Sequence, residues 1–142
     1  MKQPVSLALR VKQTYQDQDP ETLELMTDGT LEYREGCWHI CYQETALTGL
    51  EGVTTAFQVE PDTITLTRTG SLHSQMVFRT GVEHTSLYKM EFGALMITVC
   101  AAQVDHNLTP FGGTVDLVYA IEVEQSAAGL VEYHLDITPK NP

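Results

Sequence analysis

The sequence predicts an all-β domain, on two observations. Apolar and polar residues alternate along most of the chain, and turn-forming residues separate the alternating segments at short intervals. Residues 115–123 and 131–137 show the alternation most clearly, with an apolar residue at every second position. Such a segment is typical of a strand with one buried and one wet face. We therefore expect about ten antiparallel strands, little or no helix, and a single domain over residues 1–142.

The individual strands follow from the same pattern. Alternating segments occupy residues 5–11, 22–26, 38–46, 53–59, 64–68, 115–123 and 131–137. Short turn signals separate the segments: Asp28-Gly29, Glu35-Gly36, Gly49 to Gly52, Pro61-Asp62, Thr69-Gly70, Thr80-Gly81, Phe92-Gly93, Gly112-Gly113 and Ala128-Gly129. Asp19-Pro20-Glu21 resembles a helix start. The period of two that follows it favours a turn that enters a strand.

The many short strands predict a closed sheet. An open sheet exposes unpaired backbone donors and acceptors at both edges. Closure into a barrel removes those edges, and a barrel of about eight to ten strands has an interior that side chains fill or that holds one small ligand. We therefore expect a closed antiparallel β-barrel.

Two charged residues fall on the apolar side of their strands. Glu44 is in register with Trp38, Ile40 and Tyr42, and Arg68 is in register with the apolar positions of residues 64–66. A buried charge is costly unless it is paired and hydrogen-bonded. We therefore expect Glu44 and Arg68 to meet inside the fold. The pair is either a structural ion pair that fixes the register of two strands or a polar clamp for a ligand.

The predicted interior is more polar than a packing core requires. Glu44, Arg68 and Gln103 are expected to point inward together with several tyrosines, and a buried tyrosine hydroxyl needs a partner. The large inward residues are Trp38, Tyr42, Phe57, Met76, Phe78, Tyr88, Tyr119 and Tyr133. This mixture of polar and apolar groups is the strongest indication of a binding site in the sequence.

The composition excludes several classes of function. With 19 acidic and 8 basic residues the net charge is −11, and the bases form no stripe for phosphates. Nucleic acid and anionic membranes are therefore poor partners. No apolar run approaches the roughly 20 residues of a membrane helix, and the first residues lack the apolar block of a secretion signal. Three cysteines indicate reduced thiols, and we expect a cytoplasmic protein.

Neither a metal site nor a catalytic motif is predicted. Cys37, His39 and Cys41 share one face of a strand, but residues four apart on a strand lie roughly 13 Å from each other, too far to ligate one zinc ion. The five histidines are dispersed. No Gly-x-Ser-x-Gly motif and no phosphate-binding glycine loop occur. We therefore expect no catalytic residue, metal or cofactor, with an enzyme kept as an alternative.

An ordered series of short motifs resembles the YwiB-like family of bacterial proteins, a domain family of unknown function. The motifs are Tyr42-Gln43-Glu44-Thr45, Gly49 to Thr55, Arg68-Thr69-Gly70, Met76-Val77-Phe78, Tyr88 to Gly93, Gly112-Gly113 and Tyr119. The resemblance covers essentially the whole chain. It implies a lipocalin-like (calycin) β-barrel, a cytoplasmic setting and no established activity.

Three readings of the function follow. The first is a non-enzymatic barrel that binds a small, partly apolar ligand. Its predicted binding residues are Glu44, Arg68, Tyr42, Tyr88, Tyr119, Trp38 and Met76, with Phe57 in the wall. The alternative is a protein-interaction or self-associating module, such as a homodimer, that uses the weakly charged face of Cys37, His39, Cys41, Gln43 and Thr45. The third is a small-molecule enzyme that uses Glu44 and Arg68.

Overall fold

The computed structural model consists of ten β-strands and describes residues 2–15, 18–46, 50–124 and 126–140, without the side chains of residues 127 and 128. The strands are β1 (Gln3–Thr14), β2 (Glu21–Arg34), β3 (Cys37–Gln43), β4 (Val53–Val59), β5 (Ile64–Gly70), β6 (Ser74–Phe78), β7 (Glu83–Met90), β8 (Gly93–Thr109), β9 (Gly112–Val123) and β10 (Ser126–Pro139). Within these ranges, no helix is long and apolar enough to cross a membrane.

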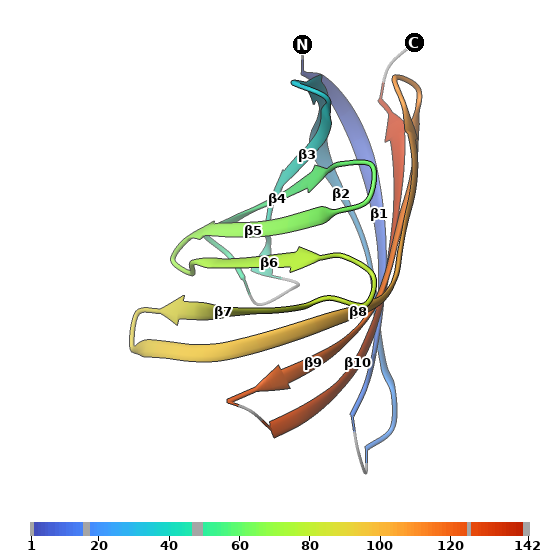
Figure 1. Ribbon diagram of the computed structural model, residues 1–142. Helices are drawn as coiled ribbons and strands as arrows, with labels where there is room; N and C mark the ends of the chain where they lie inside the picture. Colours follow the sequence, from blue (N-terminus) through green and yellow to red (C-terminus); the bar gives the residue numbers. More distant parts are fainter. Residues whose placement is uncertain (1, 16–17, 47–49, 125, 141–142) are drawn as a thin grey trace.

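All ten strands belong to one antiparallel sheet, in the order β6-β5-β4-β3-β2-β1-β10-β9-β8-β7. Apart from the pair β1 and β10, strands that are adjacent in the sheet are also consecutive in sequence, so hairpins build almost the whole sheet. The pairing of Val5 with Pro139 joins the two ends of the chain. The sheet curls, so that β4, β5 and β6 run across β1 and β10 at a steep angle, and both termini lie at the same end (Figure 1).

The curled sheet is a nearly closed barrel, as predicted. Strands β6 and β7 are its two edges, and they are consecutive in sequence. Next to β6, His73 and Lys89 exchange backbone hydrogen bonds of 2.9 and 2.8 Å. At the other end of β6, the Gly81 amide donates to the Ala101 carbonyl at 2.9 Å. Between these points the Val77 amide donates to Nδ1 of His84 at 3.4 Å, so a side chain replaces part of the backbone ladder.

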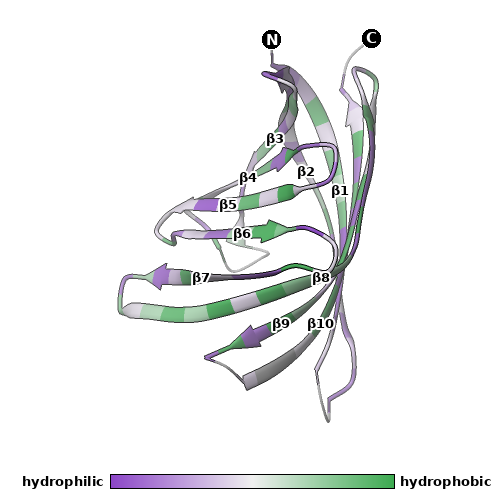
Figure 2. Cartoon of the chain, in the orientation of Figure 1, coloured by the Kyte–Doolittle hydropathy of each residue, from purple (hydrophilic) through white to green (hydrophobic). Residues whose placement is uncertain are grey.

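The core lies inside the barrel and follows the alternation of the sequence. In β4 the odd-numbered residues from Val53 to Val59 are buried. In β5 the even-numbered residues Ile64 and Leu66 are buried. Figure 2 shows the resulting bands of hydrophobic and hydrophilic residues along the strands. Burial of these side chains supplies the main driving force for folding. The prediction of an all-β fold with about ten strands is confirmed.

Two predicted turns were wrong. Asp28-Gly29 lies inside β2, and Ala128-Gly129 lies inside β10. Gly29 instead allows close packing, because a Cβ atom there would lie 2.6 Å from the Cys41 carbonyl oxygen and 2.7 Å from Leu7 Cδ1. In β10 the register shifts between Ala127 and Gly129, which marks a β-bulge. Residues 47–49, part of another predicted turn, lie outside the described residues.

The inward orientation predicted for Gln103 was also wrong. The register of β8 against β9 shifts between Ala101 and Gln103, so the strand carries one extra residue there. Ala101 still faces the core, but after the bulge Val104 packs against the core and Gln103 is exposed. The Gln103 amide donates to Asp105 on the outer face instead.

Candidate functional site

A row of polar side chains crosses the inside of the barrel. Tyr42 on β3 pairs with Thr55 on β4, Thr55 pairs with Arg68 on β5, and Arg68 pairs with Ser74 on β6. Paired residues in neighbouring strands point to the same face. Tyr42, Thr55 and Ser74 are buried and Arg68 is half-buried. Four consecutive strands therefore each contribute a polar group to one line in the interior.

Glu44 adds a carboxylate to this row. It follows β3, and its amide continues the ladder by donating to the Val53 carbonyl at 2.8 Å, which keeps the side chain on the inner face. The Thr55 hydroxyl donates to Glu44 Oε2 at 2.5 Å. Arg68 Nε lies 3.9 Å from the same oxygen, and only 2% of the Glu44 side chain is exposed. The predicted meeting of the two charges inside the fold is confirmed.

Arg68 is held less completely than Glu44. Its contact with Glu44 is an ion pair whose atoms are too far apart for a hydrogen bond. Nε is buried and makes no hydrogen bond to any described residue. A guanidinium group carries five N–H donors, and a buried donor without a partner costs free energy. The geometry therefore leaves Arg68 able to bind a further acceptor.

Tyrosines from the opposite wall approach the same region. The hydroxyl groups of Tyr42 and Tyr133 lie 3.2 Å apart, which joins β3 to β10 across the interior. The ring of Tyr133 packs against Phe57 with centroids 5.6 Å apart. Tyr119, on β9, packs against Phe78 at 4.5 Å. These ring contacts fix the directions of the hydroxyl groups.

The buried tyrosines remain protonated at neutral pH. Burial raises the pKa of Tyr42 and of Tyr119 to about 12. Burial also raises the pKa of Tyr133 well above the ordinary value, and its hydrogen bond with Tyr42 adds to the effect. The positive charge of Arg68 lowers all three pKa values but does not overcome burial. Each phenol can therefore donate a hydrogen bond.

These groups surround a cavity of about 240 Å³ inside the barrel. The polar part of its lining consists of Gln13, Tyr15, Tyr42, Glu44, Arg68, Tyr88, Tyr119 and Tyr133. The apolar part includes Leu9, Val11, Met76, Ile97, Ile121 and Val131. Leu23 also lines the cavity and is 40% exposed, so the cavity reaches the surface near the hairpin between β1 and β2.

The cavity brings together most of the residues that the sequence analysis selected. Glu44, Arg68, Tyr42, Tyr88, Tyr119 and Met76 all line it. Trp38 does not: it packs at the edge of the core, with its ring 4.8 Å from that of Tyr33. Phe57 also lies outside the lining and is fully buried in the core.

Sequence reasoning missed two polar members of the site. Tyr133 belonged to the expected inward set, but nothing in the sequence showed that it lies opposite Tyr42. Thr55 alternates with Val53 and Phe57 in the inward register, so its polarity was a signal that the sequence did contain. The apolar wall from β1, β8, β9 and β10 was likewise visible only as part of a core.

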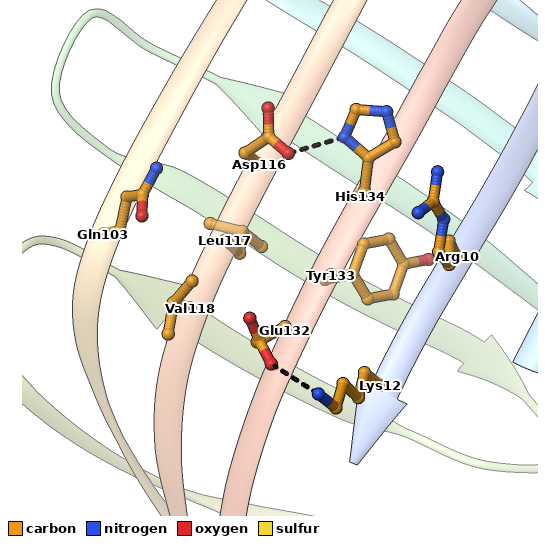
Figure 3. A pocket seen from close by; sticks show the side chains of 9 residues that line it. All are labelled: Arg10, Lys12, Gln103, Asp116, Leu117, Val118, Glu132, Tyr133 and His134. Atoms are coloured by element: carbon orange, nitrogen blue, oxygen red, sulfur yellow. Dashed lines mark hydrogen bonds and ion pairs between the residues drawn. The ribbon is translucent and has the colours of Figure 1, made fainter. Parts of the chain in front are cut away.

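A larger hollow, of about 380 Å³, lies on the outer face of β1, β10, β9 and β8 (Figure 3). Apart from Arg10, its charged groups are already paired. Lys12 Nζ lies 4.0 Å from Glu132 Oε2, and His134 Nδ1 lies 2.6 Å from Asp116 Oδ1. His134 Nε2 also lies 3.1 Å from Asp136 Oδ1. Paired and partly exposed charges bind a ligand weakly, so we take the interior cavity as the candidate site.

The predicted absence of a metal site concerned the cysteines and histidines. Cys37, Cys41 and Cys100 are free thiols and half-buried. Among the residues that the structure describes, no group of three His, Cys, Asp or Glu side chains is placed to hold a metal ion.

Known proteins are similar to this chain in fold and in sequence. The family model described as "Domain of unknown function (DUF1934)" matches residues 8–137. The chain belongs to the DUF1934 family. It is 26% identical over 124 residues to the uncharacterized beta-barrel protein YwiB of Bacillus subtilis, and the match covers 87% of this chain and 86% of that protein. It also resembles the crystal structure of the ywiB protein from Bacillus subtilis. That comparison has a TM-score of 0.89 at 21% identity and covers 99% of this chain and 94% of the other.

The comparisons thus establish a YwiB-like β-barrel of the DUF1934 family. Within this family assignment, the polar row and the cavity are features of this chain's own side chains.

Proposed function

We propose that the barrel interior of this DUF1934 protein binds one small, partly apolar organic molecule with a polar head group. The observation that carries the proposal is the cavity of about 240 Å³, whose lining combines polar groups with aliphatic side chains. Ligand sites are mostly apolar, with a few convergent polar groups. The volume lies just below the usual range for drug-sized ligands, so the ligand is small. The free thiols support a cytosolic setting.

Arg68 distinguishes this cavity from an ordinary gap in packing. A barrel that needed only stability would satisfy a half-buried guanidinium with hydrogen bonds from its own residues. Here Nε is buried without such a bond to any described residue. A ligand that accepts hydrogen bonds from Arg68 removes that penalty and gains contacts with the aliphatic side chains of the lining.

Native mass spectrometry of the protein purified from its own host tests the proposal. We expect a bound molecule that dissociates on denaturation. The variant Ile121→Trp fills the cavity and abolishes this adduct, because Ile121 is part of the lining. The matched control Glu122→Trp places the same side chain on the outer face of β9, and we expect this variant to retain the bound molecule. The proposal is contradicted if the protein purified from its host carries no bound molecule and the mass spectra of the two variants do not differ.

A second candidate function, self-association, is supported by the outer face of β3–β6. Its twelve outward positions carry no Asp, Glu, Lys or Arg, in a chain of net charge −11. We call this surface the neutral face; it consists of Cys37, His39, Cys41, Gln43, Thr54, Ala56, Gln58, Thr65, Thr67, Thr69, Gln75 and Val77. Two strongly acidic copies repel each other, and contact through the neutral face avoids burying charge.

Sedimentation velocity tests this second candidate. We expect a concentration-dependent dimer that Ala56→Glu abolishes, because the variant places a charge in the centre of the neutral face. Ala120→Glu is the matched control, since Ala120 is exposed on the outer face of β9. A monomer at high concentration, or equal effects of the two variants, contradicts self-association through this face.

A further inference from the structure

The charged group that remains available to a ligand in the cavity is a hydrogen-bond donor. The carboxylate of Glu44, the acceptor in the polar row, already receives the Thr55 hydroxyl and lies beside Arg68, and its side chain is 2% exposed. Nε of Arg68 is buried and makes no hydrogen bond to a described residue, and the Tyr119 side chain, which is 6% exposed, lines the same cavity. The cavity therefore offers a guanidinium and a phenol, while its acid is already engaged.

We infer that the head group of the ligand is a carboxylate, bound by Arg68 and Tyr119, and that its apolar body lies against the aliphatic wall. This inference rests on the proposed function. A guanidinium fork matches a carboxylate in geometry as well as in charge, and such hydrogen bonds are stronger than those between neutral groups. A cationic head group would face Arg68 with no unengaged acid to balance it, and a neutral alcohol would leave part of the fork unbonded.

The surroundings of Arg68 support this assignment. Tyr42, Tyr119 and Tyr133, which come from three different strands, line the same cavity as Arg68. All three remain protonated at neutral pH because burial raises their pKa values. The aliphatic side chains Ile97, Ile121 and Val131 line the same cavity and provide a surface for an apolar body. A short monocarboxylate fits both its volume and its two kinds of lining.

A matched series of three probes tests the head group. The probes are 3-phenylpropionate, 3-phenylpropanol and 3-phenylpropylammonium, which share one body and differ in charge. Calorimetric titration is expected to show 3-phenylpropionate binding at least about tenfold more tightly than the other two. In a proton–nitrogen spectrum, the Arg68 Nε–H signal, assigned by its loss in Arg68→Lys, is expected to shift with 3-phenylpropionate. A structural role of Arg68 alone would leave that signal in place.

Tyr119→Phe removes one hydroxyl and keeps the ring that packs on Phe78. It is expected to lower the affinity for 3-phenylpropionate about fivefold to tenfold. Tyr33→Phe is the control, because Tyr33 lies outside the cavity lining, and it leaves the affinity unchanged.

The outcomes separate the two proposals. If 3-phenylpropanol or 3-phenylpropylammonium binds as tightly as the acid, the carboxylate assignment is overturned while ligand binding in the cavity stands. Binding of the acid without a shift of the Arg68 signal also overturns the assignment. If none of the three probes binds, the carboxylate assignment fails, and the native mass spectrum decides ligand binding separately.

Discussion

Two ion pairs on opposite faces of the same sheet have nearly equal atom separations but very different surroundings. Arg68 Nε and Glu44 Oε2 are 3.9 Å apart inside the barrel, where 16% and 2% of the side chains are exposed. Lys12 Nζ and Glu132 Oε2 are 4.0 Å apart on the outer face, where half of each side chain is exposed. At about 4 Å, two unit charges attract by about 1 kcal/mol in water and about 4 kcal/mol at an effective dielectric constant of 20. The two pairs therefore differ in their exposure to solvent and not in the distance between their charges.

The difference shows what each pair can contribute. On the outer face, water solvates each charge whether or not it is paired, so loss of a partner changes little. Inside the barrel, loss of one partner strands the other in a medium that solvates it poorly. A face that penalises unpaired charge so strongly also attracts a complementary ligand group strongly. The same physics therefore makes the interior both the more vulnerable part of the molecule and the better binding site.

The largest expected effect is that of Arg68→Met. This variant leaves Glu44 with the Thr55 hydrogen bond but without its cationic partner. We expect it to lower the free energy of unfolding by about 3–5 kcal/mol. Urea denaturation measures the loss.

The double variant Glu44→Gln, Arg68→Met provides the control for that experiment. It removes both charges together, so no charge is stranded, and we expect it to regain most of the lost stability. Small and equal losses in the single and double variants would show that the interior solvates the pair as water does.

The inward placement of this pair could be predicted from the sequence because it depends on local alternation. Side chains in a strand alternate with a period of two, and neither β3 nor β5 interrupts it, so Glu44 and Arg68 fall where the pattern puts them. The same reasoning gives the wrong orientation for Gln103 because β8 carries a bulge after Ala101. No glycine or proline marks that bulge, since it reflects how the long strand fits its neighbours in the curled sheet.

The cavity itself could not be predicted, because it depends on contacts between distant segments. The hydroxyl pair of Tyr42 and Tyr133 joins residues 91 positions apart in sequence. Alternation predicts that both face inward, but it contains no information on which inward residues lie opposite each other. The exclusion of Trp38 from the lining has the same cause, because its place along the barrel axis depends on strand tilt and stagger.

The Tyr42–Tyr133 pair provides an interior comparison without charge. Tyr133→Phe removes one hydroxyl and leaves the other without this partner in a buried setting. We expect a loss of about 1 kcal/mol in the free energy of unfolding, well below that of Arg68→Met. The double variant Tyr42→Phe, Tyr133→Phe should lose less than the sum of the two singles, as chemical denaturation would reveal. A loss as large as that of Arg68→Met would refute the distinction between neutral and charged partners.

His134 on the outer face contributes stability that depends on pH. The hydrogen bond to Asp116 raises its pKa above the ordinary value of 6.5, with a further contribution from Asp136. Because the folded state binds the proton more tightly, this contribution is full below the unfolded value and disappears as pH rises through the raised value. His134→Asn is therefore expected to destabilise more at about pH 5 than at about pH 9.

Asp116→Asn provides the control for the His134 experiment. It removes the main cause of the raised pKa and should reduce the difference that His134→Asn makes between the two pH values. Denaturation curves of both single variants and of the double variant at each pH measure this coupling. A loss from His134→Asn that is the same at both pH values would show that the protonated form gains nothing from its acidic neighbours.

The smallest expected effect is that of Lys12→Ala, which breaks the outer ion pair in the hollow of Figure 3. Exposed pairs of this kind contribute about 0–1 kcal/mol, so we expect a loss within about 0.5 kcal/mol that shrinks further when salt is added. Urea denaturation at low and high ionic strength provides the measurement. A loss comparable to that of Arg68→Met would mean that water reaches the outer hollow no better than the interior. It would then count as evidence that a partner or a ligand covers the outer hollow.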